Sequence, residues 1–239
     1  MLREISTDAD FPVTAEEITQ GIDAIYAWIR AVYPNGCTIC GILTGSMVLV
    51  KMLEDAKKGL KNSHLYPTCF IGAKSYVDDT QKDKVMIYGP PSQYLFKKRN
   101  VVLVDDVVDS GNTMRAVTQF LSQFRPNEVK GAAMCAKGNL PNWLDPNAVA
   151  FKLPKDKFIV GFGMDFNGHY RELTEIRPIT DEEKELAKVA KTGDVPHEKL
   201  PEGFDTIGRR PVTGRSQSLK TTSTDLGVKE HQHSDTKAK

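Results

Sequence analysis

The apolar positions between residues 14 and 33 follow the period of an amphipathic helix. Isoleucines recur at positions 18, 22, 25 and 29, a spacing that places them on one helical face. Thr14 followed by Glu17 has the pattern of a capping box, which satisfies free backbone N–H groups at a helix start. The pattern predicts a helix over residues 14–33 whose apolar stripe faces the core.

Between residues 38 and 163, short apolar runs alternate with helical segments. Strand-like runs lie at 38–43, 67–77, 85–88, 101–104, 129–135 and 158–161. Helical periodicity is found at 47–58 and 113–124, and Pro126 follows the second segment. Continuous apolar strands that alternate with helices are typical of a parallel sheet buried on both faces. The predicted fold class is therefore α/β, with a parallel sheet and helices on both faces.

The last part of the chain has a different composition. The segment TDEEKELAKVAK, residues 180–191, predicts an exposed helix with Thr180 as its cap. Beyond Gly193 the chain is rich in Ser, Thr, Lys, Arg, Gly and Pro, with only scattered apolar residues. Such a segment buries too little apolar surface to offset the entropy of ordering it. We expect residues 195–239 to form a disordered tail.

Composition and charge narrow the possible classes of function. The chain has 239 residues, of which 40% are hydrophobic and 26% charged, and its formal net charge is +1. This balance supplies no general attraction for nucleic acid or for an anionic membrane surface. No apolar run reaches the roughly 18 residues of a spanning helix, and the polar start MLREISTDADF does not resemble a signal peptide. We expect a cytoplasmic protein that binds neither membrane nor nucleic acid.

The cysteines do not indicate a metal or redox site. Cys37 and Cys40 form a C-x-x-C pair, but the other two cysteines, Cys69 and Cys135, supply no second pair at zinc-ligand spacing. The pair lies in or beside a predicted strand, where positions i and i+3 point to opposite faces. We therefore predict buried thiols.

The stretch VVLVDDVVDSGNTM, residues 101–114, carries the candidate chemistry. A buried strand is predicted to end at Val104, so Asp105 and Asp106 should lie at the carboxyl edge of the sheet, where ligands bind in α/β folds. Residues 109–113, Asp-Ser-Gly-Asn-Thr, then form a tight loop before a helix. Gly111 lets the backbone approach a ligand closely, and the N–H groups at the helix start attract anions. We interpret this loop as a phosphate cradle.

The carboxylates need a different target, because they repel phosphate. Two adjacent carboxylates suit the vicinal hydroxyls of a ribose, or a Mg²⁺ ion that bridges the repulsion. One compound combines a 5-phosphate, a ribose diol and a metal-binding pyrophosphate, namely phosphoribosyl pyrophosphate. The alternative is an acidic helix cap with incidental charges, and three aspartates beside a buried strand argue against it.

The same stretch resembles the phosphoribosyl pyrophosphate signature of type I phosphoribosyltransferases. Four other segments are similar to parts of the hypoxanthine-guanine phosphoribosyltransferase family: LTGSMVLVKML (43–53), AKSYVDD (73–79), VKGAAMCAK (129–137) and DKFIVGFGMDFNGHYREL (156–173). In that family these are the first pyrophosphate loop, the mobile lid, the strand that ends in the purine-binding lysine, and the purine hood with its metal loop. The resemblance covers about residues 10–178.

This resemblance implies an organisation and a set of site residues. The expected parts are a phosphoribosyltransferase domain at 1–178 with a purine hood around 137–178, a C-terminal helix at 179–194, and the tail. The ribose diol would contact Asp105 and Asp106, directly or through Mg²⁺; the general base would be Asp109; and the 5-phosphate would bind Ser110, Gly111, Asn112 and Thr113. Pyrophosphate and the lid would involve Thr44, Gly45, Ser75, Tyr76 and Arg171. The purine would be bound by Lys137, Lys157, Phe158, Ile159 and Asp165, and Asp165 would also engage Mg²⁺.

The implied reaction belongs to purine salvage. It transfers 5-phosphoribosyl from phosphoribosyl pyrophosphate to hypoxanthine or guanine, with Mg²⁺ as cofactor, and gives IMP or GMP and pyrophosphate. Two alternatives stay open, a xanthine-preferring relative and a regulator with this fold but no catalysis. The family often carries Lys or Arg where this chain has Thr44, so pyrophosphate binding would be weaker or shifted toward Arg171. A homodimer or homotetramer is expected by analogy with the family.

Overall fold

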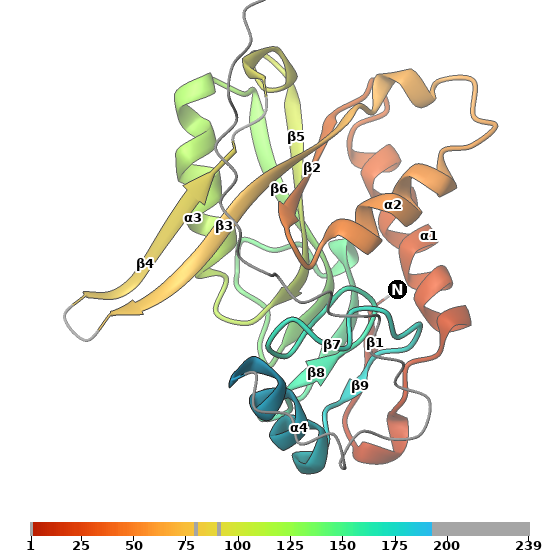
Figure 1. Cartoon of the computed structure of the whole chain (residues 1–239). Helices are drawn as coiled ribbons and strands as arrows, with labels where there is room; N and C mark the ends of the chain where they lie inside the picture. Colours follow the sequence, from red (N-terminus) through yellow and green to blue (C-terminus); the bar gives the residue numbers. More distant parts are fainter. Residues whose placement is uncertain (1, 79–80, 90–91, 193–239) are drawn as a thin grey trace, which may run out of the picture. The chain divides into compact units, whose positions relative to one another are not determined.

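The main element of the fold is a seven-stranded sheet with the strand order β1-β7-β6-β5-β2-β3-β4 (Figure 1). The computed structural model describes residues 2–78, 81–89 and 92–192, so the predicted tail at 195–239 lies outside the described residues. The strands are β1 (Arg3–Glu4), β2 (Thr38–Leu43), β3 (Thr68–Asp78), β4 (Gln81–Tyr88), β5 (Asn100–Val108), β6 (Glu128–Lys137) and β7 (Val149–Leu153). Neighbouring strands are parallel except β3 and β4, which are antiparallel. The predicted α/β class is confirmed, as a mostly parallel sheet.

Helices cover both faces of this sheet. Those that do so are α1 (Ala15–Val32), α2 (Met47–Ala56) and α3 (Asn112–Leu121), whereas α4 (Asp181–Thr192) is bonded to the segment around Arg177. α1 and α2 lie on one face and α3 lies on the other (Figure 1). Side chains of the central strand β5 alternate between the two layers: Val102 and Val104 join the cluster with α1 and α2, and Val101 and Leu103 join the cluster with α3. Because both faces of β5 are buried, every position of this part of the strand is apolar.

The start of α1 is the predicted capping box. The Thr14 hydroxyl accepts the backbone N–H of Glu17 at 3.3 Å, and the Glu17 carboxylate accepts the backbone N–H of Thr14 at 2.8 Å. The four isoleucines of the predicted stripe are all buried. In the described part of the chain, no helix is long and apolar enough to cross a bilayer.

All four cysteines are buried free thiols, as predicted. Cys37 and Cys135 belong to the layer of α1 and α2, whereas Cys40 and Cys69 belong to the layer of α3. Cys40 and Cys69 are register partners on β2 and β3. Burial raises the pKa of Cys37 to about 12. The C-x-x-C spacing therefore places its two sulfur atoms in different layers, and they cannot act as a pair.

The hood is a separate small sheet. The run predicted as a strand at 158–161 is β8 (Ile159–Val160), which pairs with β9 (Arg177–Pro178) and not with the main sheet. β1, β7 and β9 were not predicted, because strands of two to five residues give too little periodicity. The first two pair with each other and extend the main sheet beyond β6.

A partly buried ion pair fixes α4 to the hood. The guanidinium of Arg177 donates to both carboxylate oxygens of Glu183, at 2.6 and 2.8 Å. Thr180 caps the helix by accepting the backbone N–H of Glu183 at 3.2 Å, as predicted, and the hydroxyl of Tyr170 donates to the Glu183 carbonyl at 3.1 Å. The helix is confirmed, whereas the domain boundary expected at residue 178 stays a prediction.

Replacement of Glu183 by Gln should destabilise the fold at neutral pH. Hydrogen bonding to Arg177 lowers the pKa of Glu183 from its ordinary 4.5 to about 2. The stabilising contribution is therefore fully present above about pH 4.5 and is lost as the pH falls through 2. We expect Glu183→Gln to lower the unfolding free energy at pH 7 by about 1–3 kcal/mol, because Arg177 loses its ionic partner.

Urea titrations between pH 7 and pH 2 measure this effect. The difference in unfolding free energy between Glu183→Gln and the unsubstituted protein should shrink toward pH 2. Asp181→Asn removes a carboxylate from the exposed pair with Lys184 on the same helix and should leave stability unchanged. Equal unfolding free energies of Glu183→Gln and the unsubstituted protein at pH 7 would contradict the assignment.

Candidate functional site

Asp105 and Asp106 lie inside β5 and not beyond its end, which corrects the predicted strand end at Val104. β5 pairs with β2 only as far as Val104, but its ladder with β6 continues to Val108. On the side toward β2, the carboxylate of Asp106 faces Gly45 in the loop that follows β2. The acidic residues therefore still lie at the carboxyl edge of the neighbouring strand, where ligands bind in α/β folds.

The two carboxyl groups share a buried environment. Asp105 is 8% exposed, and its Oδ1 accepts the backbone N–H of Asp106 at 3.1 Å. Burial, and then the charge of Asp106, raise the pKa of Asp105 well above its ordinary value of 3.8. Burial also raises the pKa of Asp106, while the nearby Arg171 favours its charged form. Such a pair attracts a cation or a hydrogen-bond donor, because either one relieves the repulsion.

The predicted phosphate loop leads directly from β5 into α3. Asp109 and Ser110 are exposed. Gly111 is the N-cap of α3 with φ of 76°, a left-handed conformation that glycine adopts without strain. The backbone N–H of Asn112 donates to the Ser110 hydroxyl at 3.3 Å. Because Gly111 has no side chain to cap the helix, an anion can bind the N–H groups of its first turn.

The loop after β2 approaches the acidic pair very closely. A Cβ added to Gly45 would lie 1.7 Å from Oδ2 of Asp106, so only glycine leaves room for that carboxylate. The carbonyl oxygen of Gly45 faces Gly163 of the hood, where an added Cβ would lie 2.5 Å from it. Thr44 is exposed, and the Leu43–Thr44 peptide bond is cis. Gly45 thus lies between β5 and the hood.

The hood loop carries an ion pair beside the carboxylates. Oδ1 of Asp165 and Nη2 of Arg171 are 2.7 Å apart. Oδ2 of Asp165 accepts the backbone N–H of Gly168 at 2.6 Å, and Nη1 of Arg171 donates to the carbonyl of Gly163. Arg171 also acts electrostatically on Asp106. The structure therefore brings the predicted pyrophosphate and metal residues of the hood up to Gly45 and β5.

A lysine and an exposed aromatic ring meet at the end of β6. Nζ of Lys137 lies 5.5 Å from the ring centroid of Phe158. Phe158 is 45% exposed and packs edge-on against Phe166, with 5.2 Å between the centroids. Ile159 has a buried side chain and pairs with Pro178 in the hood sheet. This arrangement can stack a flat ring on Phe158 and hydrogen-bond a polar edge of it.

Three predicted residues are not seen to join this cluster. The ammonium of Lys157 pairs with Asp8 at 2.8 Å, so this side chain is engaged by the N-terminal segment. Ser75 and Tyr76 lie in β3 on its ladder with β4, and their side chains fall outside the described part of the structure. Their roles in the lid stay predictions.

The carboxylates that could hold a metal are divided between β5 and the hood. In residues 2–78, 81–89 and 92–192, no three His, Cys, Asp or Glu side chains converge on a metal position. Mg²⁺ typically takes one or two carboxylates and completes its shell with water and phosphate oxygens of a ligand. The oxygen donors of Asp105, Asp106 and Asp165 fit a hard cation of this kind that arrives with its ligand.

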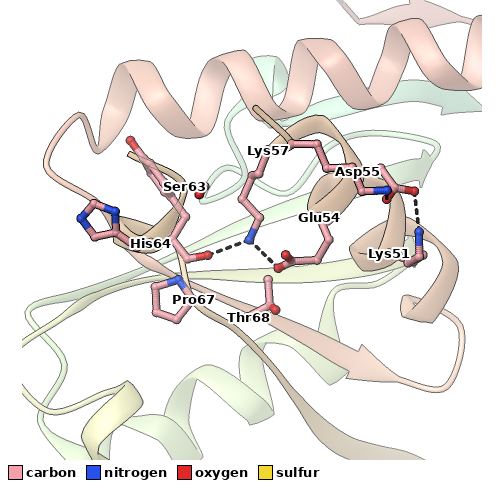
Figure 2. Close-up of a pocket in the computed structure, with 10 residues that line it drawn as sticks. Lys51, Glu54, Asp55, Lys57, Ser63, His64, Pro67 and Thr68 are labelled. Atoms are coloured by element: carbon pink, nitrogen blue, oxygen red, sulfur yellow. Dashed lines mark hydrogen bonds and ion pairs between the residues drawn. The ribbon is translucent and has the colours of Figure 1, made fainter. Parts of the chain in front are cut away.

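A polar pocket of about 660 Å³ lies elsewhere, at the far end of α2 (Figure 2). Figure 2 shows the Lys57 ammonium between Glu54 and a backbone carbonyl, that of Tyr66, and Lys51 against Asp55. Each lysine that lines the pocket is already paired with a carboxylate. Three lysines share two carboxylates there, since Lys51 and Lys58 both pair with Asp55, and the pocket lies apart from the acidic pair.

The contact between Gly45 and Gly163 is not evident from the sequence pattern. A signal exists in the segment Gly161-Phe162-Gly163, since glycines inside an apolar run often mark a close backbone approach. At Gly161, an added Cβ would lie 1.9 Å from the carbonyl oxygen of Glu175. Both glycines are thus required by neighbouring backbone.

Sequence comparison relates the chain to a family of known proteins. The profile of the family described as "Phosphoribosyl transferase domain" matches residues 14–167. Phosphoribosyltransferase domain-containing protein 1 of Xenopus tropicalis is 29% identical over 166 residues, which are 67% of this chain and 74% of that protein. Hypoxanthine-guanine phosphoribosyltransferase of Rattus norvegicus is 32% identical over 116 residues, 48% of this chain and 53% of that protein.

Solved structures share the fold. A variant of hypoxanthine phosphoribosyltransferase from Trypanosoma cruzi, complexed with the product IMP, has a TM-score of 0.61 at 23% identity, covering 75% of this chain and 94% of that one. Hypoxanthine phosphoribosyltransferase from Staphylococcus aureus has a TM-score of 0.59 at 24% identity, covering 71% and 90%. The expected type I phosphoribosyltransferase fold is confirmed by these likenesses.

Removal of one buried carboxyl group should stabilise the ligand-free protein at neutral pH. The unfolded chain loses the Asp105 proton near the ordinary pKa of 3.8, whereas the folded protein keeps it to higher pH. Folding therefore becomes less favourable as the pH rises from 3.8 to the raised pKa. Asp105→Asn keeps the acceptor for the backbone N–H of Asp106 without the charge, and should add on the order of 1 kcal/mol at pH 7.

Melting temperatures in EDTA between pH 3 and pH 8 check this expectation. The gain of Asp105→Asn should vanish below about pH 4. Asp109→Asn removes a carboxylate from the exposed neighbouring loop, and this variant should follow the unsubstituted protein throughout. A loss of stability in Asp105→Asn at pH 7 would refute the argument.

Proposed function

Because the chain belongs to the phosphoribosyl transferase domain family, we propose that it transfers 5-phosphoribosyl from phosphoribosyl pyrophosphate to a 6-oxopurine, hypoxanthine or guanine, giving IMP or GMP. One juxtaposition carries the proposal. The start of α3 follows the acidic pair on β5, and β6 runs beside β5 as far as the pair Val108–Ala136. Lys137 comes next on β6, with the exposed Phe158 beside it. This arrangement suits one donor sugar and one flat base.

The phosphoribosyl group would bind between β5 and α3. The 5-phosphate would take the backbone N–H groups of residues 110–113 and the hydroxyls of Ser110 and Thr113, where the helix dipole favours an anion. The ribose hydroxyls would donate to Asp105 and Asp106, whose raised pKa values reflect a need for donors or a cation. These carboxylates and Asp165 would hold Mg²⁺, whose positive charge would offset the negative charge of the pyrophosphate group.

Asp109 would serve as the general base. N9 of the purine attacks the anomeric carbon, the bond from that carbon to pyrophosphate breaks, and the N7 proton passes to Asp109. Its exposed place between the acidic pair and the phosphate loop supports this role. A carboxylate so placed reaches a bound base without competing for the 5-phosphate.

The base would stack on Phe158 and be read by Lys137. An ammonium is a donor only, so it matches the 6-oxo acceptor of hypoxanthine and guanine and opposes the 6-amino group of adenine. The backbone of Ile159 would read the ring edge. Lys157, paired with Asp8, would contribute its backbone to the base pocket rather than its ammonium.

Pyrophosphate would bind between the Gly45 loop and the hood. Thr44 supplies no cation there, whereas the hood supplies Arg171, which is held against Asp165 and the Gly163 carbonyl and acts electrostatically on Asp106. The lid residues Ser75 and Tyr76 would close over the transition state and exclude water. Cytoplasmic location and assembly as a homodimer or homotetramer belong to the same proposal.

A xanthine-preferring enzyme and a catalytically silent regulator are the rival functions. Purified protein with phosphoribosyl pyrophosphate and Mg²⁺ should release pyrophosphate when hypoxanthine or guanine is added. We expect kcat/KM for adenine to be lower by at least about 10², because its amino group would face the Lys137 ammonium. Turnover of xanthine above the other bases would support the first rival, and no turnover of any base would support the second.

Asp109→Asn tests the catalytic assignment. The variant keeps size and hydrogen bonding but cannot accept the proton, so we expect kcat to fall by ~10²–10⁴ with KM for the donor nearly unchanged. Steady-state and single-turnover rates with hypoxanthine measure this. A decrease of less than a few-fold, with chemistry rate-limiting, would remove Asp109 from the mechanism.

A further inference from the structure

The connection from β6 to β7, all of which the structure describes, contains no α-helix, only a single 3-10 turn at Pro146–Ala148. Residues 138–145 run back over the layer of α3, where Leu144 is buried in the same cluster as Met114 and Leu121. The backbone N–H of Leu144 donates to the carbonyl of Pro141 at 2.9 Å and closes a turn around Trp143. The loop that follows Lys137 at the end of β6 thus packs against α3, the helix that starts at the phosphate loop.

Trp143 lies directly on the glycine that starts α3. A Cβ added to Gly111 would lie 2.6 Å from Cζ2 of Trp143, and one added to Gly131 would lie 3.1 Å from Cζ3. The same ring edge therefore fills the space beside two glycines, one in the phosphate loop and one in β6. The other part of the ring is open, since Trp143 is 41% exposed.

The loop that carries Trp143 is anchored on the opposite layer. The indole N–H of Trp28, in α1, donates to Oδ2 of Asp145 at 2.9 Å. Oδ1 of Asp145 accepts the backbone N–H of Asn147 at 2.8 Å. Buried Leu144 and hydrogen-bonded Asp145 directly follow Trp143, and the Leu144–Pro141 bond closes the turn around it, so the backbone that carries the indole is held beside Gly111.

We propose that Trp143 is a positioning residue for the phosphate loop, and this inference rests on the function proposed above. Gly111 is a flexible residue at the point where the backbone N–H groups must converge on the 5-phosphate. The indole restricts it from one side, because any shift of Gly111 toward the ring meets rigid aromatic atoms. Trp143 therefore sets donor affinity through Gly111 without contacting the reacting atoms.

Ordinary core packing is the rival explanation, and kinetics separates the two. Packing alone predicts a lower melting temperature with KM values unchanged. Positioning predicts that Trp143→Ala raises KM for phosphoribosyl pyrophosphate by about tenfold, since a displaced loop loses oriented contacts, while KM for hypoxanthine stays the same. Trp143→Phe refills the space beside Gly111 and should restore the donor KM to within about twofold.

A matched control is available in Tyr94, an aromatic residue that is 75% exposed and lies outside the site. Tyr94→Ala should leave both KM values unchanged. A donor KM that is unchanged in Trp143→Ala, or a tenfold rise that Trp143→Phe does not reverse, would overturn the proposal.

Tryptophan fluorescence of the unsubstituted protein gives a second readout, and Trp143→Phe assigns its signal. Ribose 5-phosphate, used as the probe, should change tryptophan emission saturably, and Trp143→Phe should abolish the change while still binding the probe in calorimetry. If the unsubstituted protein forms IMP but its emission does not respond, this inference fails alone. If it neither forms IMP or GMP nor binds ribose 5-phosphate, the proposed function fails with it.

Discussion

The site depends on backbone contacts that leave no room for a Cβ. The carboxylate of Asp106 lies against Gly45, and the carbonyl of Gly45 faces Gly163. Three segments that are distant in sequence, the end of β5, the loop after β2 and the hood loop, therefore converge within van der Waals contact. A side chain at either glycine would separate β5 from the hood, and the cation of Arg171 would move away from the buried carboxylates. The chemistry of the hood and that of the sheet form one site only because two glycines allow it.

The same arrangement buries two carboxyl groups, whose ionisation is unfavourable away from water. Asp105 and Asp106 are buried side by side; burial raises the pKa of both carboxyl groups, and the charge of Asp106 raises that of Asp105 further. β5 tolerates this because it is a central strand, bonded to β6 along its length and to β2 as far as Val104, and because the four residues before the acids are fully buried valines and leucine. The apolar part of β5 thus stabilises a strand whose acidic end destabilises the ligand-free protein. Such a conflict between ligand affinity and stability is common at functional sites.

Much of this fold could be predicted from periodicity, and the exceptions have a common cause. The helix with its Thr14–Glu17 cap and the buried strands follow from local patterns. β1, β7 and β9 do not, because their pairing is decided by distant partners. The acidic pair and the phosphate loop are readable because their residues are contiguous. The Lys137–Phe158 contact needed a resemblance to a known family, and the packing of Trp143 on Gly111 needed coordinates, since side chains from separate loops leave no shared pattern.

The positions of the four cysteines allow thiol alkylation to report which part of the protein unfolds first. Two thiols lie in each hydrophobic layer, Cys37 and Cys135 on the side of α1 and Cys40 and Cys69 on the side of α3. Burial raises the pKa of Cys37 and Cys135, and a hydrogen bond with Cys69, together with burial, raises the pKa of Cys40, so these thiols stay protonated and poorly nucleophilic. An alkylating reagent reacts only with molecules in which the relevant layer has separated from the sheet. The order in which the four sulfurs are modified distinguishes a fold that opens as one cooperative unit from one whose two layers come apart in sequence.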